Sequence, residues 1–274
     1  MTAYYNENDK QTCAWLRELI KQDLIAPGDV DERDIRDVRS DDLVQFKQIH
    51  FFAGIGVWSY ALRNAGWPDD RPVLTGSCPC QPFSGAGKKT GTKDKRHLWP
   101  EMYRLIAGLP ESKRAPTIFG EQVANAESWF DALQNDLARE NYAAGLVVFP
   151  ACSVGAPHLR QRLYWFADRV ADGDGKRSQR HGQKSEQQQH AQGRQIASGY
   201  SAESCDTHGA GPTNGYWRAA DWIWCRDEKW RPTEPGVAPL VDGSSARMVR
   251  LRGYGNAIVA PQAQAFIESY METE

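Results

Sequence analysis

The sequence predicts an α/β fold, a doubly wound and mostly parallel sheet with a small additional lobe. Short apolar segments alternate with amphipathic helical segments up to about residue 167, and this alternation is typical of a parallel sheet covered on both faces. The length of 274 residues and the hydrophobic content of 41% are sufficient for one core with an appended lobe. No run approaches ~18 apolar residues and the first residues are polar, so we expect a cytoplasmic protein without a membrane span or signal peptide.

The expected elements follow from local patterns of apolar residues. Strand character appears at AYYNE (3–7), RDIRDV (33–38), QIHFFAGIG (48–56), PVLTGSC (72–78), PTIFGEQV (116–123), LVVFPAC (146–152) and RLYWFA (162–167). Apolar residues recur at helical spacing in KQTCAWLRELIKQDLI (10–25), VWSYALRNAG (57–66) and SWFDALQNDLAREN (128–141). The C-terminal segment 250–271 predicts a turn followed by a helix.

The chain changes character after Asp168. Residues 172–199 contain almost no apolar side chains, so we expect a loop there. Four tryptophans, at positions 217, 222, 224 and 230, then predict the core of a small lobe. Residues 158–200 carry 8 Lys and Arg against 4 acids, whereas residues 1–42 carry 11 acids against 6 Lys and Arg. The later region would therefore attract phosphate and the earlier one would repel it.

The six cysteines are scattered, without the spacing of a metal site, so we expect neither a disulfide framework nor a bound metal. Cys80 is distinctive because it lies in GSCPCQPFSGAG (76–87), where Pro79 restricts the backbone directly before it. The carboxyl ends of parallel strands are where such sheets place their chemistry. On these features alone, the thiol is compatible with a nucleophile or with a structural residue. Likewise, the FFAGIG turn (51–56) is typical of a ligand-binding loop or of a plain tight turn.

Five segments together resemble the motifs of the DNA cytosine-5 methyltransferases. They are FFAGIG, GSCPCQPFSGAG, GEQV (120–123), GAPHLRQRLYWFA (155–167) and RGYGNAIVAPQ (252–262), and they occur in the family's order. The resemblance implies a Rossmann-like catalytic domain over residues 1–167 and 246–274, with a target-recognition region over 168–245. It also implies S-adenosylmethionine as the methyl donor and a flipped-out cytosine of double-stranded DNA as the acceptor.

The resemblance also implies roles for individual residues. Cys80 would add to C6 of the cytosine, and Glu121 would supply an acid at N3. Arg160 and Arg162 would hold the base carbonyl and order the loop around it. The implied donor-binding residues are Phe52, Ala53, Gly54, Ile55, Gly56, Pro79 and Asn256, and the implied contacts to the target base are Gln81, Ser84 and Gln122. Cys78 would point away from Cys80 on an extended chain, so we expect it to pack in the core.

The chain departs from the family between the glycine turn and the cysteine loop. Members usually place two strands there, one ending in an acid for the donor ribose and one carrying an aspartate for the adenine. Only residues 57–75 lie between them here, too few for both units, but residues 1–45 resemble the missing unit. We therefore predict a permuted order in which Glu7 holds the ribose and Asp34, or less favourably Asp29, holds the adenine amine. Alternatively, residues 1–45 are an unrelated acidic extension. The permuted order also predicts a crossover of the rare hand, unless the helix after the glycine turn changes face.

Two other functions are compatible with the motifs: the same chemistry on RNA, and a non-catalytic DNA-binding relative. The separate lobe favours DNA, and the presence of Cys80, Glu121 and both arginines favours an enzyme. A phage- or prophage-like member, acting in a bacterial or phage-infected cell, is compatible with a cognate restriction enzyme as partner, with shielding of phage DNA, or with acting alone. The sequence does not select among these roles.

Overall fold

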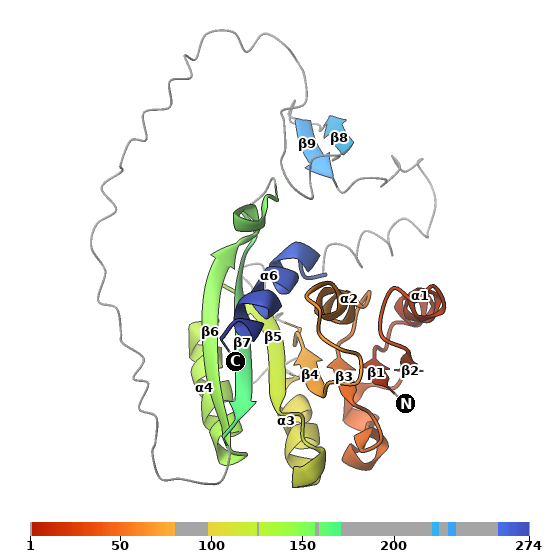
Figure 1. Cartoon of the computed structure of the whole chain (residues 1–274), viewed down its shortest axis with the longest axis vertical. Helices are drawn as coiled ribbons and strands as arrows, with labels where there is room; N and C mark the ends of the chain where they lie inside the picture. Colours follow the sequence, from red (N-terminus) through yellow and green to blue (C-terminus); the bar gives the residue numbers. More distant parts are fainter. Residues whose placement is uncertain are drawn as a thin grey trace, which may run out of the picture.

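A computed structural model gives the structure of residues 2–79, 98–124, 126–156, 159–170 and 257–273 (Figure 1). For residues 127, 128, 221–224 and 230–233 it describes the backbone alone. Within these ranges, no helix is both long and apolar enough to cross a membrane.

A seven-stranded sheet forms the centre of the fold, in the order β2-β1-β3-β4-β5-β7-β6. Its strands are β1 (Ala3–Asn6), β2 (Gly28–Asp31), β3 (Gln48–Phe51), β4 (Val73–Gly76), β5 (Thr117–Val123), β6 (Tyr142–Pro150) and β7 (Gln161–Arg169). The first five strands are parallel to one another, and β7 runs antiparallel to both β5 and β6. The predicted doubly wound, mostly parallel α/β sheet is confirmed.

Helices cover both faces of the sheet. One face carries α1 (Lys10–Lys21), α2 (Val57–Asn64) and α6 (Ala260–Met271), with α1 and α2 side by side in Figure 1. The other face carries α3 (Trp99–Gly108), α4 (Glu127–Arg139) and the 3-10 turns η1 (Ile35–Asp37) and η2 (Ser40–Leu43). Two further 3-10 turns, η4 (Glu111–Lys113) and η5 (Ala151–Val154), lie in connections, and a separate hairpin pairs β8 (Asp221–Trp224) with β9 (Trp230–Thr233).

The predicted strand at RDIRDV (33–38) is wrong. The strand beside β1 is Gly28–Asp31, and residues 35–37 form the 3-10 turn η1. The carboxylate of Asp34 accepts a hydrogen bond from the backbone N–H of Arg36 and so caps this turn. Gly28 lets β2 approach β1, because a Cβ at this position would lie 2.0 Å from the carbonyl oxygen of Ala3.

The strand order supports the permuted arrangement, because residues 1–45 contribute two strands to the sheet and do not form a separate extension. β1 and β2 are integral strands of the sheet, and β1 pairs in parallel with β3, the strand that leads into the glycine turn. In the family's usual order, these two strands would follow that turn in the chain. Here the same positions beside β3 are filled by a segment that precedes it.

One crossover has the opposite hand to its neighbours. The β1–α1–β2 connection steps one way along the sheet, and β3–α2–β4 steps the opposite way over the same face. Two such connections must differ in hand. The β4–α3–β5 connection steps in the same direction as β3–α2–β4 but over the other face, so it shares the hand of β1–α1–β2. Because about 98% of these crossovers are right-handed, we assign β3–α2–β4 as the left-handed one, as the permuted order predicts.

A cluster of tryptophans packs tightly against the middle of β5. Trp165 of β7 is fully buried and lies edge-on to Trp99 and Trp129. A Cβ added at Gly120 would lie 2.2 Å from the Trp165 ring. Gly120→Ala is therefore expected to destabilise the protein by about 1–3 kcal/mol, measured by urea unfolding, because the ring has no room to move.

Gly76→Ala on the adjacent strand β4 is the matched control. Its added Cβ would meet the flexible end of Met102, which can shift at little cost. An equal or larger loss of stability in Gly76→Ala would contradict this account of the packing.

Candidate active site

The carboxyl ends of the parallel strands bring most of the predicted residues that the structure describes to one edge of the sheet. Glu7 follows β1, the glycine turn follows β3, and the segment leading to Cys80 follows β4. Glu121 lies on β5, one residue beyond the last ladder pair of β4 with β5. In doubly wound sheets this edge is the usual place for ligands.

The glycine turn has a conformation that requires small residues. Gly54 and Gly56 have φ angles of 53° and 80°, in the left-handed region. A Cβ at Gly56 would also lie 3.1 Å from Leu16 and 3.2 Å from Ile25. Phe52 has a φ of 52°, which is uncommon for a bulky side chain. Strained backbone of this kind is concentrated at functional sites.

Glu7 is bound directly to the glycine turn. Its Oε2 accepts a hydrogen bond from the N–H of Gly54 at 3.0 Å, and its Oε1 accepts one from the N–H of Asp9 at 2.9 Å. Each carboxylate oxygen can accept more than one hydrogen bond. Glu7 can therefore brace the turn and still accept hydrogen bonds from a ligand.

Asp34, rather than Asp29, lies beyond the carboxyl end of β2. Asp29 pairs with Tyr4 inside the strand and precedes its end by two residues. Asp31, at the end of the strand, accepts hydrogen bonds from Tyr4 and Arg33. Burial raises the pKa of Asp31, but these hydrogen bonds outweigh it, and the net pKa is lowered. Asp34 keeps a side chain that is 35% exposed.

Glu121 and Arg162 form a close ion pair at this edge. Arg162 Nε lies 2.8 Å from Glu121 Oε1, and both side chains are largely buried. The antiparallel register of β5 with β7 pairs Val123 with Arg162 and Glu121 with Tyr164, which brings the arginine beside the acid. Burial raises the pKa of Glu121 above its usual range, and the charges of Arg162 and Arg160 offset part of this effect.

Arg160 joins the start of β7 to the C-terminal segment. Its Nη2 donates to the carbonyl oxygen of Ala257 at 2.8 Å, and its backbone has a φ of 25°. Burial and the adjacent Arg162 charge lower the pKa of Arg160, while Glu121 opposes this shift. The two predicted arginines thus make different contacts.

Gln122 anchors the segment that leads to Cys80. Its Nε2 donates to the carbonyl oxygen of Cys78 at 3.3 Å, and the side chain is almost fully buried. The thiol of Cys78 packs against Met102 in the core, as predicted, and burial raises its pKa. Pro79, the next residue, is exposed. Cys80, Gln81, Ser84 and Asn256 lie outside the described residues, so their predicted roles stay predictions.

Two features of this edge were missed by the sequence analysis. Trp58 Nε1 of α2 donates to Ser77 Oγ at 3.0 Å, which ties the helix after the glycine turn to the root of the cysteine loop. Asn6 Nδ2 donates to the carbonyl oxygen of Arg33 at 2.9 Å and so holds the segment after β2. The signal that could have pointed to these residues was their position in the sequence. Each lies within a few residues of a segment that was predicted to bind a ligand.

A family model for the C-5 cytosine-specific DNA methylases matches residues 2–234. The type II methyltransferase M1.ScrFI of Lactococcus lactis subsp. cremoris is 35% identical over 100 residues, which cover 35% of this chain and 25% of that protein. The type II methyltransferase M.NgoMIV of Neisseria gonorrhoeae is 30% identical over 100 residues, or 36% of this chain and 32% of that protein. The chain thus matches a quarter to a third of the length of these curated relatives.

Among solved structures, the Entamoeba histolytica methyltransferase EhMeth has a TM-score of 0.41 and 14% identity, covering 64% of this chain and 55% of that one. A Spodoptera frugiperda DNMT2 mutant has a TM-score of 0.39 and 16% identity, covering 62% of this chain and 42% of that one. The curated relatives match about a third of this chain, whereas the family model matches most of it. The chain therefore belongs to the C-5 cytosine-specific DNA methylase family.

Proposed function

We propose that this protein transfers a methyl group from S-adenosylmethionine to C5 of a flipped-out cytosine in DNA. The observation that carries the proposal is the buried Glu121–Arg162 pair, beside the root of the Cys80 loop and at the same sheet edge as the glycine turn. A carboxyl group with a raised pKa is suited to donating a proton. The adjacent guanidinium has N–H groups suited to a base carbonyl.

The chemistry requires a nucleophile because C5 of cytosine is unreactive by itself. In the proposed reaction, the Cys80 thiolate forms a bond to C6 while N3 takes a proton from Glu121, which leaves an electron-rich C5. C5 then takes the methyl group. A base removes the C5 proton, the bond from sulfur to C6 breaks, and the proton on N3 returns to Glu121. Cys80 is thereby regenerated.

The residues at the sheet edge fit S-adenosylmethionine, which supplies an electrophilic methyl group when bound. The left-handed conformation at Gly54 and Gly56 allows a ligand to approach the backbone closely. The carboxylate of Glu7 is suited to the ribose hydroxyls, and that of Asp34 to the adenine amine, because both groups on the ligand are donors. Glu7 has a second role, because it also holds the glycine turn in place.

Glu7→Ala is expected to weaken donor binding by roughly 10- to 100-fold, the usual effect of losing hydrogen bonds to a charged group. Calorimetric titration with S-adenosylmethionine would measure it, and DNA affinity should be unchanged. Glu18→Ala is the matched control, because Glu18 lies on α1 and its carboxylate pairs with Lys21 and Gln22 of the same helical turn. Equal donor affinity in Glu7→Ala and the wild type would contradict the assignment of Glu7.

The activity itself is tested by incubating the protein with a donor that carries a labelled methyl group and with unmethylated plasmid DNA. Label in the DNA, followed by sequencing for 5-methylcytosine, would establish the reaction and reveal the target sequence. Transfer RNA is the parallel acceptor. Label in the RNA alone would assign the chemistry to RNA, and label in neither would contradict the proposed function.

A further inference from the structure

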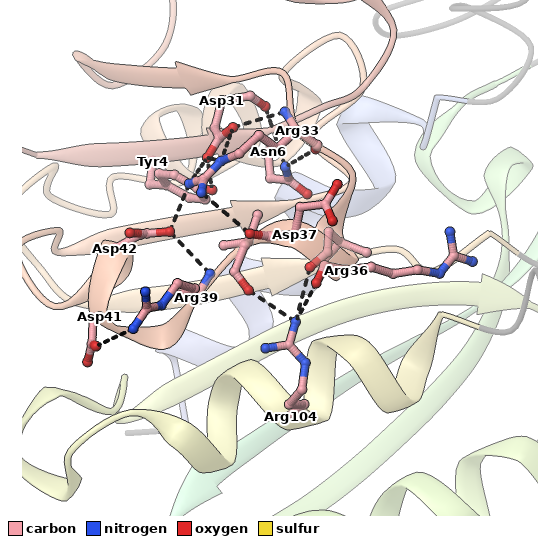
Figure 2. Close-up of polar contacts among 12 residues, drawn as sticks. Tyr4, Asn6, Asp31, Arg33, Arg36, Asp37, Arg39, Asp41, Asp42 and Arg104 are labelled. Atoms are coloured by element: carbon pink, nitrogen blue, oxygen red, sulfur yellow. Dashed lines mark hydrogen bonds and ion pairs between the residues drawn. The ribbon is translucent and has the colours of Figure 1, made fainter.

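The turn that carries Asp34 is held on one side by a side chain of α3. Arg104 Nη2 donates to the backbone carbonyls of Ile35 at 3.2 Å, Arg36 at 3.4 Å and Val38 at 3.1 Å (Figure 2). Carbonyls of a short 3-10 turn lack the regular partners of a long helix. A single guanidinium therefore binds three carbonyl groups of the 34–38 turn.

The same turn is held from the sheet side by a second network. Arg33 forms hydrogen bonds with the carboxylate of Asp31, one of them 2.6 Å long, and with Asp42 Oδ2 at 2.8 Å. Asn6 donates to the carbonyl of Arg33. Figure 2 shows these residues on the opposite side of the turn from Arg104. The backbone around Asp34 is thus fixed from two directions before any ligand binds.

The orientation of Arg104 is itself fixed by its own helix. Glu101, three residues earlier on α3, accepts a hydrogen bond from Arg104 Nε at 3.0 Å. This contact uses the Nε edge and leaves Nη2 directed at the turn. The planar guanidinium allows both contacts at once, which the single ammonium group of lysine would match only in part.

Arg104 also connects two parts of the proposed site that are far apart in the chain. The 34–38 turn belongs to the N-terminal segment predicted to replace the usual donor-binding unit, whereas α3 begins at Trp99, on the C-terminal side of the cysteine loop. We propose that Arg104 is a positioning residue that holds Asp34 for recognition of the adenine amine of the donor. This inference rests on the proposed function, because it names the residue that orders one of its ligand contacts.

The test compares two ligands that differ only at the amine. S-adenosylhomocysteine carries the adenine amino group, and its purine-riboside analogue carries a hydrogen atom in its place. We expect the wild type to bind the adenine compound at least about 10-fold more tightly, because the purine-riboside analogue has no amino group to donate to Asp34. In Arg104→Gln, we expect this ratio of dissociation constants to fall below about 3, and in Arg104→Lys to lie between the two values.

Arg169→Gln is the matched control, because Arg169 also binds a carbonyl oxygen and a carboxylate, both of Glu111. It should keep the wild-type ratio. A simple loss of stability would weaken both ligands equally and would not change the ratio, so the readout separates positioning from folding. If the wild type prefers the adenine compound but Arg104→Gln, or a folded Arg104→Lys, keeps the same ratio of dissociation constants, the inference about Arg104 is overturned and the proposed function is not. A wild type that binds neither compound would overturn the proposed function as well.

Discussion

Cys80→Ser is expected to reduce methyl transfer by at least roughly 10³-fold while leaving donor and DNA binding close to those of the wild type. A serine hydroxyl is almost entirely protonated near neutral pH, whereas a thiol is partly ionised and intrinsically more nucleophilic. Without addition to C6, C5 of cytosine is too weak a nucleophile to attack the methyl group. Transfer of a labelled methyl group to DNA under single-turnover conditions would measure the loss.

Two other cysteines provide the comparison for this variant. Cys152 is exposed, and Cys152→Ser should retain wild-type activity. Cys78 is buried against Met102, and burial raises its pKa, so its thiol is unsuited to act as a nucleophile. Activity of Cys80→Ser within 3-fold of the wild type would exclude Cys80 as the nucleophile.

Glu121→Gln is expected to lower kcat by about 10²- to 10³-fold, within the usual range for loss of a general acid. Glutamine is close in shape and can donate a hydrogen bond to N3, but it cannot transfer a proton. Dissociation constants for donor and DNA should change by less than about 3-fold. Glu111→Gln, at the exposed ion pair with Arg169, is the matched control and should leave kcat unchanged.

The pH dependence gives a second measure of Glu121. Burial raises the pKa of this carboxyl group, so its protonated, proton-donating form persists to a higher pH than for an exposed glutamate. As pH rises through this pKa, the proton-donating form is lost and kcat should fall. Glu121→Gln should lack this decrease. A variant with wild-type kcat, or with the same decrease at high pH, would contradict the role of Glu121 as the acid.

Much of the fold was predictable because the signals are local. The glycine turn, the alternation of strand and helix patterns, and the acid on β5 are each encoded within a few neighbouring residues. The permuted order was also predictable, because the gap before the cysteine loop is too short for the two usual strands. The structure places the supplied strands in the order β2-β1-β3, with β1 paired to β3.

The errors and omissions come from tertiary contacts. RDIRDV (33–38) contains the strand-favouring residues Ile35 and Val38, but Asp34 caps a 3-10 turn and the strand forms earlier, where Gly28 permits close pairing. Helix α3 was not predicted, and neither was its contact from Arg104 to the 34–38 turn, which spans more than 60 residues of sequence.

Which contact each of the two arginines makes also depends on tertiary structure. The register of β5 with β7 brings Arg162 beside Glu121, whereas Arg160 lies just before the strand and binds the carbonyl of Ala257. The spacing of the motif predicts that both arginines lie near the site, but it does not predict which of them pairs with the acid.

The covalent step is tested most directly with duplex DNA that carries 5-fluorocytosine at the target position. Fluorine at C5 cannot leave as a proton does, so the reaction should stop after methyl transfer with Cys80 still bonded to C6. Mass spectrometry of the wild type with S-adenosylmethionine should then find protein, DNA and one added methyl group in a single species joined through the peptide that contains Cys80. Methylation of ordinary DNA with no such adduct on the fluorinated duplex, or an adduct at another residue, would contradict the mechanism.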